Sequence, residues 1–146
     1  GLDATAIAEQ LADTGAQFSK DSSRDMAVFS LRTLTDKRAL DQSQKVFSQI
    51  INHPDFPDDV FEREKKQQLM AIEQSQESPE DVANINFFKE LYKEHPYAHA
   101  VNGNKNTVKA LTKKQVIEFY KQYYVAENAV LVLVGAINNQ EAHTIA

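Results

Sequence analysis

Residues 57–78, PDDVFEREKKQQLMAIEQSQES, predict one long helix around which the rest of the chain can be arranged. Pro57 suits a first helical turn, where its missing N–H costs no hydrogen bond. Asp58 and Asp59 then place negative charge at the positive end of the helix dipole. The apolar residues that recur on one side of this helix, at about 100° per residue, are Phe61, Leu69 and Ile72. The segment is therefore expected to pack one face against the body of the protein.

Glu64 is the residue of this helix with the strongest claim to a special role. It lies at the margin of the apolar stripe, and Ala71 lies seven residues further along the same face, about 10 Å away. A carboxylate on a core-facing side is costly unless it is paired. A salt-bridged surface helix is the plainer interpretation, and a functional site that includes Glu64 is the alternative.

Composition excludes several classes of protein. The chain has 146 residues, a net charge of −5 and 42% hydrophobic residues, as expected for one globular domain rather than a nucleic-acid-binding protein. No apolar run approaches the roughly 18 residues of a membrane span. There are no cysteines, which excludes disulfides, thiolate zinc sites and a cysteine nucleophile. The start at Gly1, without a targeting segment, suggests a piece of a longer protein.

The order of the expected elements indicates an α+β fold in which helices cover a mainly antiparallel sheet. Helices are expected at residues 2–14, 36–52, 57–78, 79–93 and 112–124, and a last one after Asn138. Strands are expected at residues 16–22, 26–34 and 129–137. The last of these, AVLVLVGAI, is a continuous apolar run typical of a strand buried on both faces. Residues 94–107 are expected to form a loop, and residues 1–146 a single domain.

Two of these helices carry apolar residues that we expect to face inward. They are Val82, Ile85, Phe88 and Tyr92 in the first helix, and Val116, Phe119, Tyr120 and Tyr123 in the second.

The histidines do not predict a metal site. The four are His53, His95, His99 and His143. His95 and His99 have the spacing of two zinc ligands on a helix, but Pro96 disfavours a helix through them and Ala98 replaces the glutamate of an inverse HxxEH motif. We expect a loop instead, with Tyr97 packed back on the body. The chain also lacks a G-x-S-x-G elbow and a phosphate-binding P-loop.

A series of short motifs, taken in order, resembles one family. They are Gly15-Ala16-Gln17-Phe18, Ser23-Arg24-Asp25, Phe61-Glu62-Arg63-Glu64, His95-Pro96-Tyr97, Gly103, and the closing stretch from Tyr123 to Gly135, YYVAENAVLVLVG. Together they resemble the M16 metallopeptidases, the family of pitrilysin, insulinase and mitochondrial processing peptidase. The similarity covers nearly the whole chain, and the order of the motifs is more specific than any one of them.

The resemblance implies a fold and a larger assembly. The fold is a half-unit of the M16 (LuxS/MPP-like) type, in which four units enclose a chamber around unfolded peptides. Residues 1–146 would be the later part of an N-terminal-type domain, and its upstream HxxEH helix would precede Gly1.

The resemblance also assigns residues. In active members the HxxEH helix supplies two zinc histidines and the base, and a distant glutamate supplies the third ligand. That glutamate follows an Arg-Glu pair by seven residues, which here places Ala71 at the ligand position and makes Glu64 the supporting glutamate. Glu73 is nearby but about 200° around the helix. The substrate-binding Asn-Ala pair of the family matches Ser19 and Lys20.

The expected function is therefore a non-catalytic M16 subunit that completes a peptide-binding chamber with a catalytic M16 subunit or a second M16 domain. The alternative is an active zinc endopeptidase whose third ligand is Glu64 or Glu73, and a scaffold with an unrelated role is a third possibility. No metal ligand is expected in this chain, and zinc only if the parent protein is catalytic. Similarity to bacterial members suggests a periplasmic or envelope-associated location.

Overall fold

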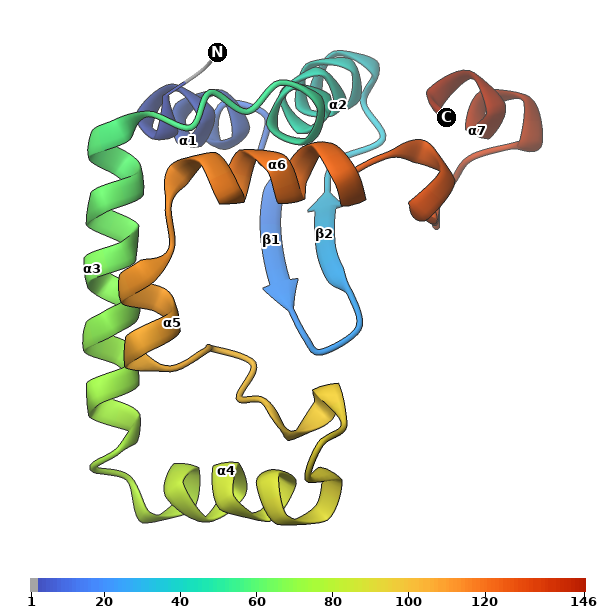
Figure 1. Ribbon diagram of the computed structural model, residues 1–146. Helices are drawn as coiled ribbons and strands as arrows, with labels where there is room; N and C mark the ends of the chain where they lie inside the picture. Colours follow the sequence, from blue (N-terminus) through green and yellow to red (C-terminus); the bar gives the residue numbers. More distant parts are fainter. Residues whose placement is uncertain (1–2) are drawn as a thin grey trace. The chain divides into compact units, whose positions relative to one another are not determined.

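The computed structural model describes residues 3–146, which form two compact units (Figure 1). The first unit contains the chain up to Lys20 together with Phe29–Asp55 and Glu118–Ala146. The second unit contains Asp21–Val28 and Phe56–Ile117.

The first unit is built on helices and a β-hairpin. Helix α1 (Ala4–Ala12) packs against α2 (Lys37–Asn52). Strands β1 (Gln17–Ser22) and β2 (Ala27–Arg32) pair antiparallel in a two-stranded sheet whose turn belongs to the second unit. The remaining elements are the last part of α6 (Lys113–Tyr123), the 3₁₀ turn η2 (Ala126–Asn128) and α7 (Asn139–Ile145).

The core of the first unit is small. Its buried residues are Leu11, Thr14, Ala39, Ser43 and Val46. The Ser43 hydroxyl lies 2.9 Å from Thr33 Oγ1 and 3.1 Å from the Leu40 carbonyl, which satisfies this buried polar group. Phe18 of β1 packs against the rings of Phe29 and Phe47, so the hairpin is fixed to α2 by aromatic contacts.

The second unit is organised around α3 (Asp58–Ser75), as its sequence predicts. Helix α5 (Lys105–Ala110) lies beside α3 (Figure 1). Lys65 and Gln68 donate hydrogen bonds across this contact to the carbonyl oxygens of Leu111 and Asn102, at 2.7 and 3.0 Å. Ile72 is the buried residue of α3, with 5% of its surface exposed.

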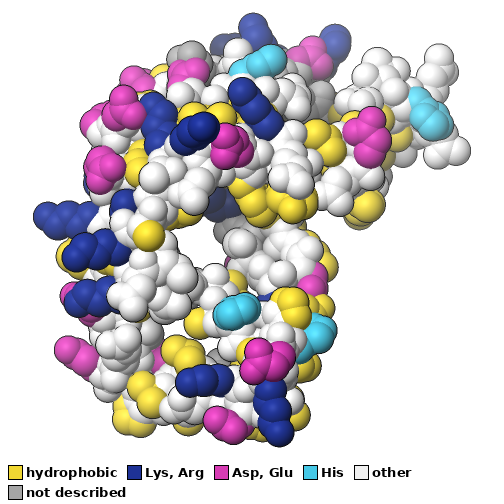
Figure 2. All heavy atoms as spheres, viewed as in Figure 1, with side chains coloured by type: hydrophobic (Ala, Val, Ile, Leu, Met, Phe, Trp, Pro, Cys, Tyr) yellow, Lys and Arg dark blue, Asp and Glu magenta, His cyan; other side chains and the backbone are white. Residues whose placement is uncertain are grey.

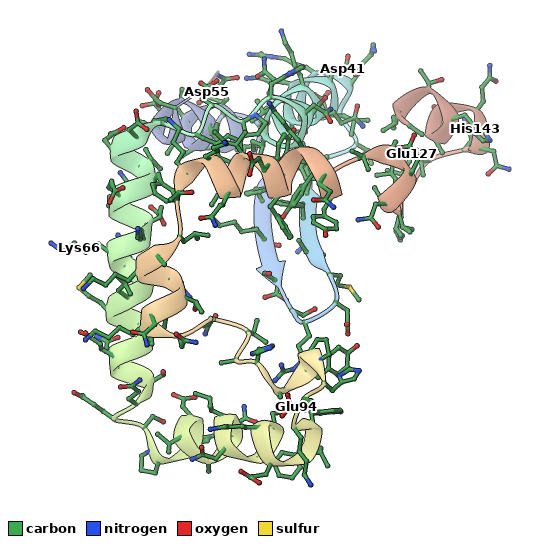
Figure 3. All side chains as sticks on the ribbon, viewed as in Figure 1. Asp41, Asp55, Lys66, Glu94, Glu127 and His143 are labelled. Atoms are coloured by element: carbon green, nitrogen blue, oxygen red, sulfur yellow. The ribbon has the colours of Figure 1, made fainter. Side chains whose placement is uncertain are left out.

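The outer side of α3 is charged. Figure 2 shows Lys and Arg side chains next to Asp and Glu side chains along it. Lys66, labelled in Figure 3, extends on the side opposite α5. Helix α4 (Pro79–Tyr92) runs crosswise at the end of α3 and continues into the 3₁₀ turn η1 (Pro96–Ala98), which packs against it.

Most element predictions are confirmed, and local capping chemistry explains why. Asp36, Ser78 and Asn138 cap α2, α4 and α7 by accepting hydrogen bonds from backbone N–H groups. Thr112 and Gln115 form a capping box at the start of α6. One detail is wrong: Pro57 is the residue before α3, with an extended backbone, and not part of its first turn. Leu2, included in the first predicted helix, lies outside the described residues.

The loop prediction for residues 94–107 missed the start of a helix. Residues 105–110 form α5, which Asn104 and Thr107 open with a capping box. Asn104 accepts hydrogen bonds from the backbone N–H groups of Asn106 and Thr107, at 2.9 and 3.0 Å, and so works as a helix N-cap.

The prediction of a strand at residues 129–137 is wrong for the structure of this chain. These residues form no strand and pair with none within residues 3–146. Val130 and Val134 are 90% and 92% exposed, so the segment is not buried on either face. A strand needs a neighbour to hydrogen-bond its backbone, and the described part of the chain offers none to this segment.

The inward-facing assignments on α4 and α6 hold only in part. Helix α4 has no fully buried residue: Phe88 and Tyr92 are half-buried, whereas Val82 and Ile85 are exposed. On α6, Val116 and Tyr120 are half-buried, whereas Phe119 and Tyr123 are exposed. The period of the pattern identifies the helices correctly, but burial depends on what covers each face.

Candidate functional site

Glu64 is exposed and lies at the margin of the packed face of α3, one turn from the half-buried Phe61 and Gln68. Its side chain is 56% exposed and accepts a hydrogen bond from Arg63, with 3.0 Å between Oε1 and Nη2. An exposed ion pair of this kind contributes little to stability. The carboxylate is thus accessible, and its neighbour Arg63 already neutralises its charge.

Ala71 is also exposed, whereas its neighbour Ile72 is buried. Ala71 follows Glu64 by two helical turns on the same side of α3, so a carboxylate at position 71 would project where Glu64 projects. A methyl group occupies that place and offers no lone pair to a metal ion. The spacing that the resemblance requires is therefore present, without the ligand.

Glu73, the other carboxylate near Ala71, is paired with a lysine of α5. Its carboxylate lies 2.6 Å from Lys105 Nζ in an ion pair between α3 and α5. The hydrogen bond and the positive charge of Lys105 lower the pKa of Glu73. This carboxylate is directed to α5 and links α3 to α5.

The pKa of Glu73 provides a direct test of this pairing. Because its folded pKa is depressed, any stabilisation by the pair is present above the unfolded pKa and is lost as pH falls through the folded pKa. We expect Lys105→Met to return the pKa of Glu73 toward the ordinary glutamate range. An NMR titration of the side-chain carboxyl carbons measures this, with Lys109→Met as control. Equal Glu73 titration in all three proteins would contradict the pairing.

Ser19 and Lys20 are both exposed on β1. In the described residues the sheet has two strands, so β1 has a neighbour on one side only. Its other edge has the backbone groups that an added peptide strand would pair with. The geometry is compatible with the predicted substrate contact, which stays a prediction.

The described residues do not gather a set of zinc ligands. Among residues 3–146 no three His, Cys, Asp or Glu side chains come together in a way that could hold a metal. His143 lies on α7 (Figure 3), and His53 follows α2. The HPYAH segment forms a 3₁₀ turn, in which His95 Nδ1 accepts a hydrogen bond from the Tyr97 backbone N–H. The segment is not α-helical in the structure, and the expectation that it holds no metal stays a prediction.

Arg24 is the centre of a network that the sequence did not reveal. Its Nη1 atom donates to the backbone carbonyls of Tyr97 and His99, at 2.8 and 2.6 Å, and its guanidinium carbon lies 4.2 Å from the Phe88 ring centroid. The Tyr97 hydroxyl donates to Asp25 at 2.5 Å, and this bond raises the pKa of Tyr97. Tyr97 therefore packs back as expected. The Ser-Arg-Asp and His-Pro-Tyr motifs meet here, which their separation in sequence could not show.

Comparison with known proteins places the chain in a family. Residues 2–105 match the insulinase family, peptidase family M16, and residues 110–146 match the peptidase M16 inactive domain. The chain belongs to the M16 family.

Among the described residues, no helix is both long and apolar enough to cross a membrane.

Individual relatives agree with this assignment, and the predicted M16-type fold is confirmed. The crystal structure of a peptidase M16 inactive domain from Pseudomonas fluorescens superposes with a TM-score of 0.96 at 35% identity, covering 99% of this chain and 35% of that one. A zinc protease of Rickettsia felis is 24% identical over 92% of this chain and 32% of its own length. Subunit 1 of the human cytochrome b-c1 complex is 21% identical over 94% of this chain and 28% of its own. The chain thus spans about a third of the relatives it matches.

Proposed function

We propose that this chain is part of a non-catalytic M16 subunit, which helps to form a peptide-binding chamber together with a catalytic M16 partner. The observation that carries the proposal is Ala71, which stands two turns beyond Glu64 where the family resemblance calls for a zinc-binding carboxylate. Without the third ligand, a zinc ion would keep only ligands from outside this chain.

The neighbouring carboxylates support this proposal. Glu64 is paired with Arg63, and Glu73 is paired with Lys105 on another helix. To bind a metal, either group would have to exchange a charged hydrogen bond for the new ligand, and Glu73 would also have to reach around α3. The relative in the human cytochrome b-c1 complex is named as a subunit of a larger assembly, which is the kind of role proposed here.

Peptide binding is assigned to the hairpin in this proposal. Strand β1 carries exposed Ser19 and Lys20 and has one edge without a neighbour among residues 3–146. An extended peptide added to this edge would gain main-chain hydrogen bonds regardless of its sequence, as a chamber for unfolded polypeptides requires.

The second candidate is an active zinc endopeptidase, because the Rickettsia felis relative is named a zinc protease. It requires an upstream HxxEH helix and Glu64 or Glu73 as the third ligand. It predicts that Glu64→Gln or Glu73→Gln abolishes proteolysis by the full-length protein, so undiminished turnover in both variants would end it.

Zinc content distinguishes the two candidates. We expect the full-length protein, purified without added metal, to hold close to no zinc per chain and to take up none on titration. We also expect it to lack chelator-sensitive proteolysis when alone. One zinc per chain together with such proteolysis would overturn the non-catalytic proposal and establish the second candidate.

A further inference from the structure

The second unit contains a cavity that the proposed function does not use. It has a volume of about 250 Å³ and lies between the end of α3, one side of α4 and residues 98–104, with Arg24 in its wall. Typical pockets for drug-sized ligands measure about 300–1,000 Å³. The cavity is therefore suited to a group the size of one amino acid.

Arg24 is held in this wall in a fixed orientation. Two backbone carbonyls accept hydrogen bonds from its Nη1 atom, and the Phe88 ring supports the plane of the guanidinium group. A guanidinium group has five N–H donors, of which Nη1 contributes two. In the part of the chain that the structure describes, the Nε and Nη2 atoms have no hydrogen-bond acceptor. A pair of donors with fork geometry is thus left for a ligand.

We propose that this cavity binds a carboxylate group through the Nε and Nη2 donors of Arg24. The planar fork of arginine matches the two oxygens of a carboxylate, and such bidentate pairs are among the strongest hydrogen-bonded contacts. Because the side chain is already fixed by its protein contacts, little further side-chain entropy is lost on binding. The side chains of Gln76 and Asn84 line the same cavity and add amide groups for a polar ligand.

The charge of the lining favours a singly charged anion. Asp81 is the acidic residue in the wall, and it offsets the charge of Arg24. Asp25 is adjacent to Arg24 in sequence, but it accepts the Tyr97 hydroxyl. His99 contributes its backbone carbonyl to Arg24. A dianion such as phosphate would face Asp81 with twice the repulsion, so a carboxylate is the better match.

Two sources supply such a carboxylate: a small acid, or a polypeptide with an acidic side chain or a free C-terminus. Both sources present the same carboxylate group to the donors of Arg24. The inference does not depend on the proposed function, because Ser19, Lys20, Glu64 and Ala71 are not among the residues that line the cavity.

The test is an NMR titration of the full-length protein with ¹⁵N-labelled arginine, in which the Arg24 Nε–H resonance reports binding. The small probes are N-acetylalanine and its amide. The peptide probes are Ac-AAEAA-NH₂ against Ac-AAQAA-NH₂, and Ac-AAAAA with a free or an amidated C-terminus. We expect a saturable shift with the carboxylate member of a pair and about ten-fold weaker binding of the neutral member.

A charge variant separates this site from general electrostatics. Asp81→Asn removes a negative charge from the wall, whereas Glu90→Gln removes the same charge from a position of α4 that does not line the cavity. We expect the first variant to tighten carboxylate binding by about two- to five-fold and the second to leave it unchanged.

The outcomes are distinct. No saturable shift with any carboxylate, equal binding of the neutral probes, or equal effects of Asp81→Asn and Glu90→Gln would overturn the proposal. A response to N-acetylalanine alone identifies a small-acid site. A response to a peptide carboxylate identifies a polypeptide contact. If the peptides bind equally with and without the carboxylate, the proposal of a peptide-binding chamber is unaffected and the proposal of a carboxylate site is overturned.

Discussion

Replacing Ile72 with alanine is expected to lower the free energy of unfolding of the second unit by roughly 2–5 kcal/mol. Ile72 is the buried residue of α3. It lies in the sequence between Gln68 and Glu73, which form hydrogen bonds with Asn102 and with Lys105 of α5. Removing its side chain loses the transfer free energy of the buried carbons and enlarges the cavity that Ile72 helps to line.

Hydrogen exchange of the full-length protein measures this effect locally. The amides of α3 and α5 should exchange faster in Ile72→Ala, whereas those of α1 and α2 should keep their rates. Met70→Ala is the matched control, because Met70 lies on the same helix but is 46% exposed, and we expect it to change exchange very little. Similar exchange in both variants would show that the Ile72 side chain is not part of a packed core.

Replacing Arg24 with alanine is expected to destabilise the loop that follows α4 by about 2–3 kcal/mol. The substitution removes two charge-assisted hydrogen bonds, to the carbonyls of Tyr97 and His99, and the cation–π contact with Phe88. It also leaves both carbonyls without their donor. Arg24→Lys keeps the charge but lacks the planar fork, so we expect it to recover only part of the loss.

Limited proteolysis and hydrogen exchange of residues 94–104 report this change. Arg32→Ala is the control, since Arg32 is an exposed arginine of β2. We expect faster cleavage and exchange in Arg24→Ala and no change in Arg32→Ala. If the loop is equally protected in all of these proteins, the hydrogen bonds of Arg24 do not hold it.

These two predictions concern residues that the sequence presented very differently. Ile72 belongs to a periodic apolar stripe, and this pattern alone predicts that it is buried. Arg24 carried no such signal, because its partners Tyr97 and His99 are more than 70 residues away in the chain. The segments that contain Arg24 and Tyr97 were identified only as motifs of the family resemblance, which does not show that they contact each other.

Local sequence signals were sufficient to locate the helices other than α5 and the two strands of the hairpin. Capping residues, helix-period apolar stripes and turn residues act over a few neighbouring positions, so they can be recognised without the fold. The same holds for the candidate site. The seven-residue interval from Glu64 to Ala71 fixes their common side of α3, and the sequence alone shows alanine at the position where the family resemblance expects a carboxylate.

Contacts between distant segments decided which strands pair and which side chains find a partner. Residues 129–137 have the composition of a central strand, yet a strand exists only where a second strand supplies its hydrogen bonds, and residues 3–146 supply none there. Glu64 is exposed, and Glu73 is paired with Lys105. The position of a residue on a helix fixes the direction of its side chain, but the tertiary structure decides which groups that side chain contacts. The Arg24 network and its cavity likewise depend on contacts between distant segments, which local chemistry does not encode.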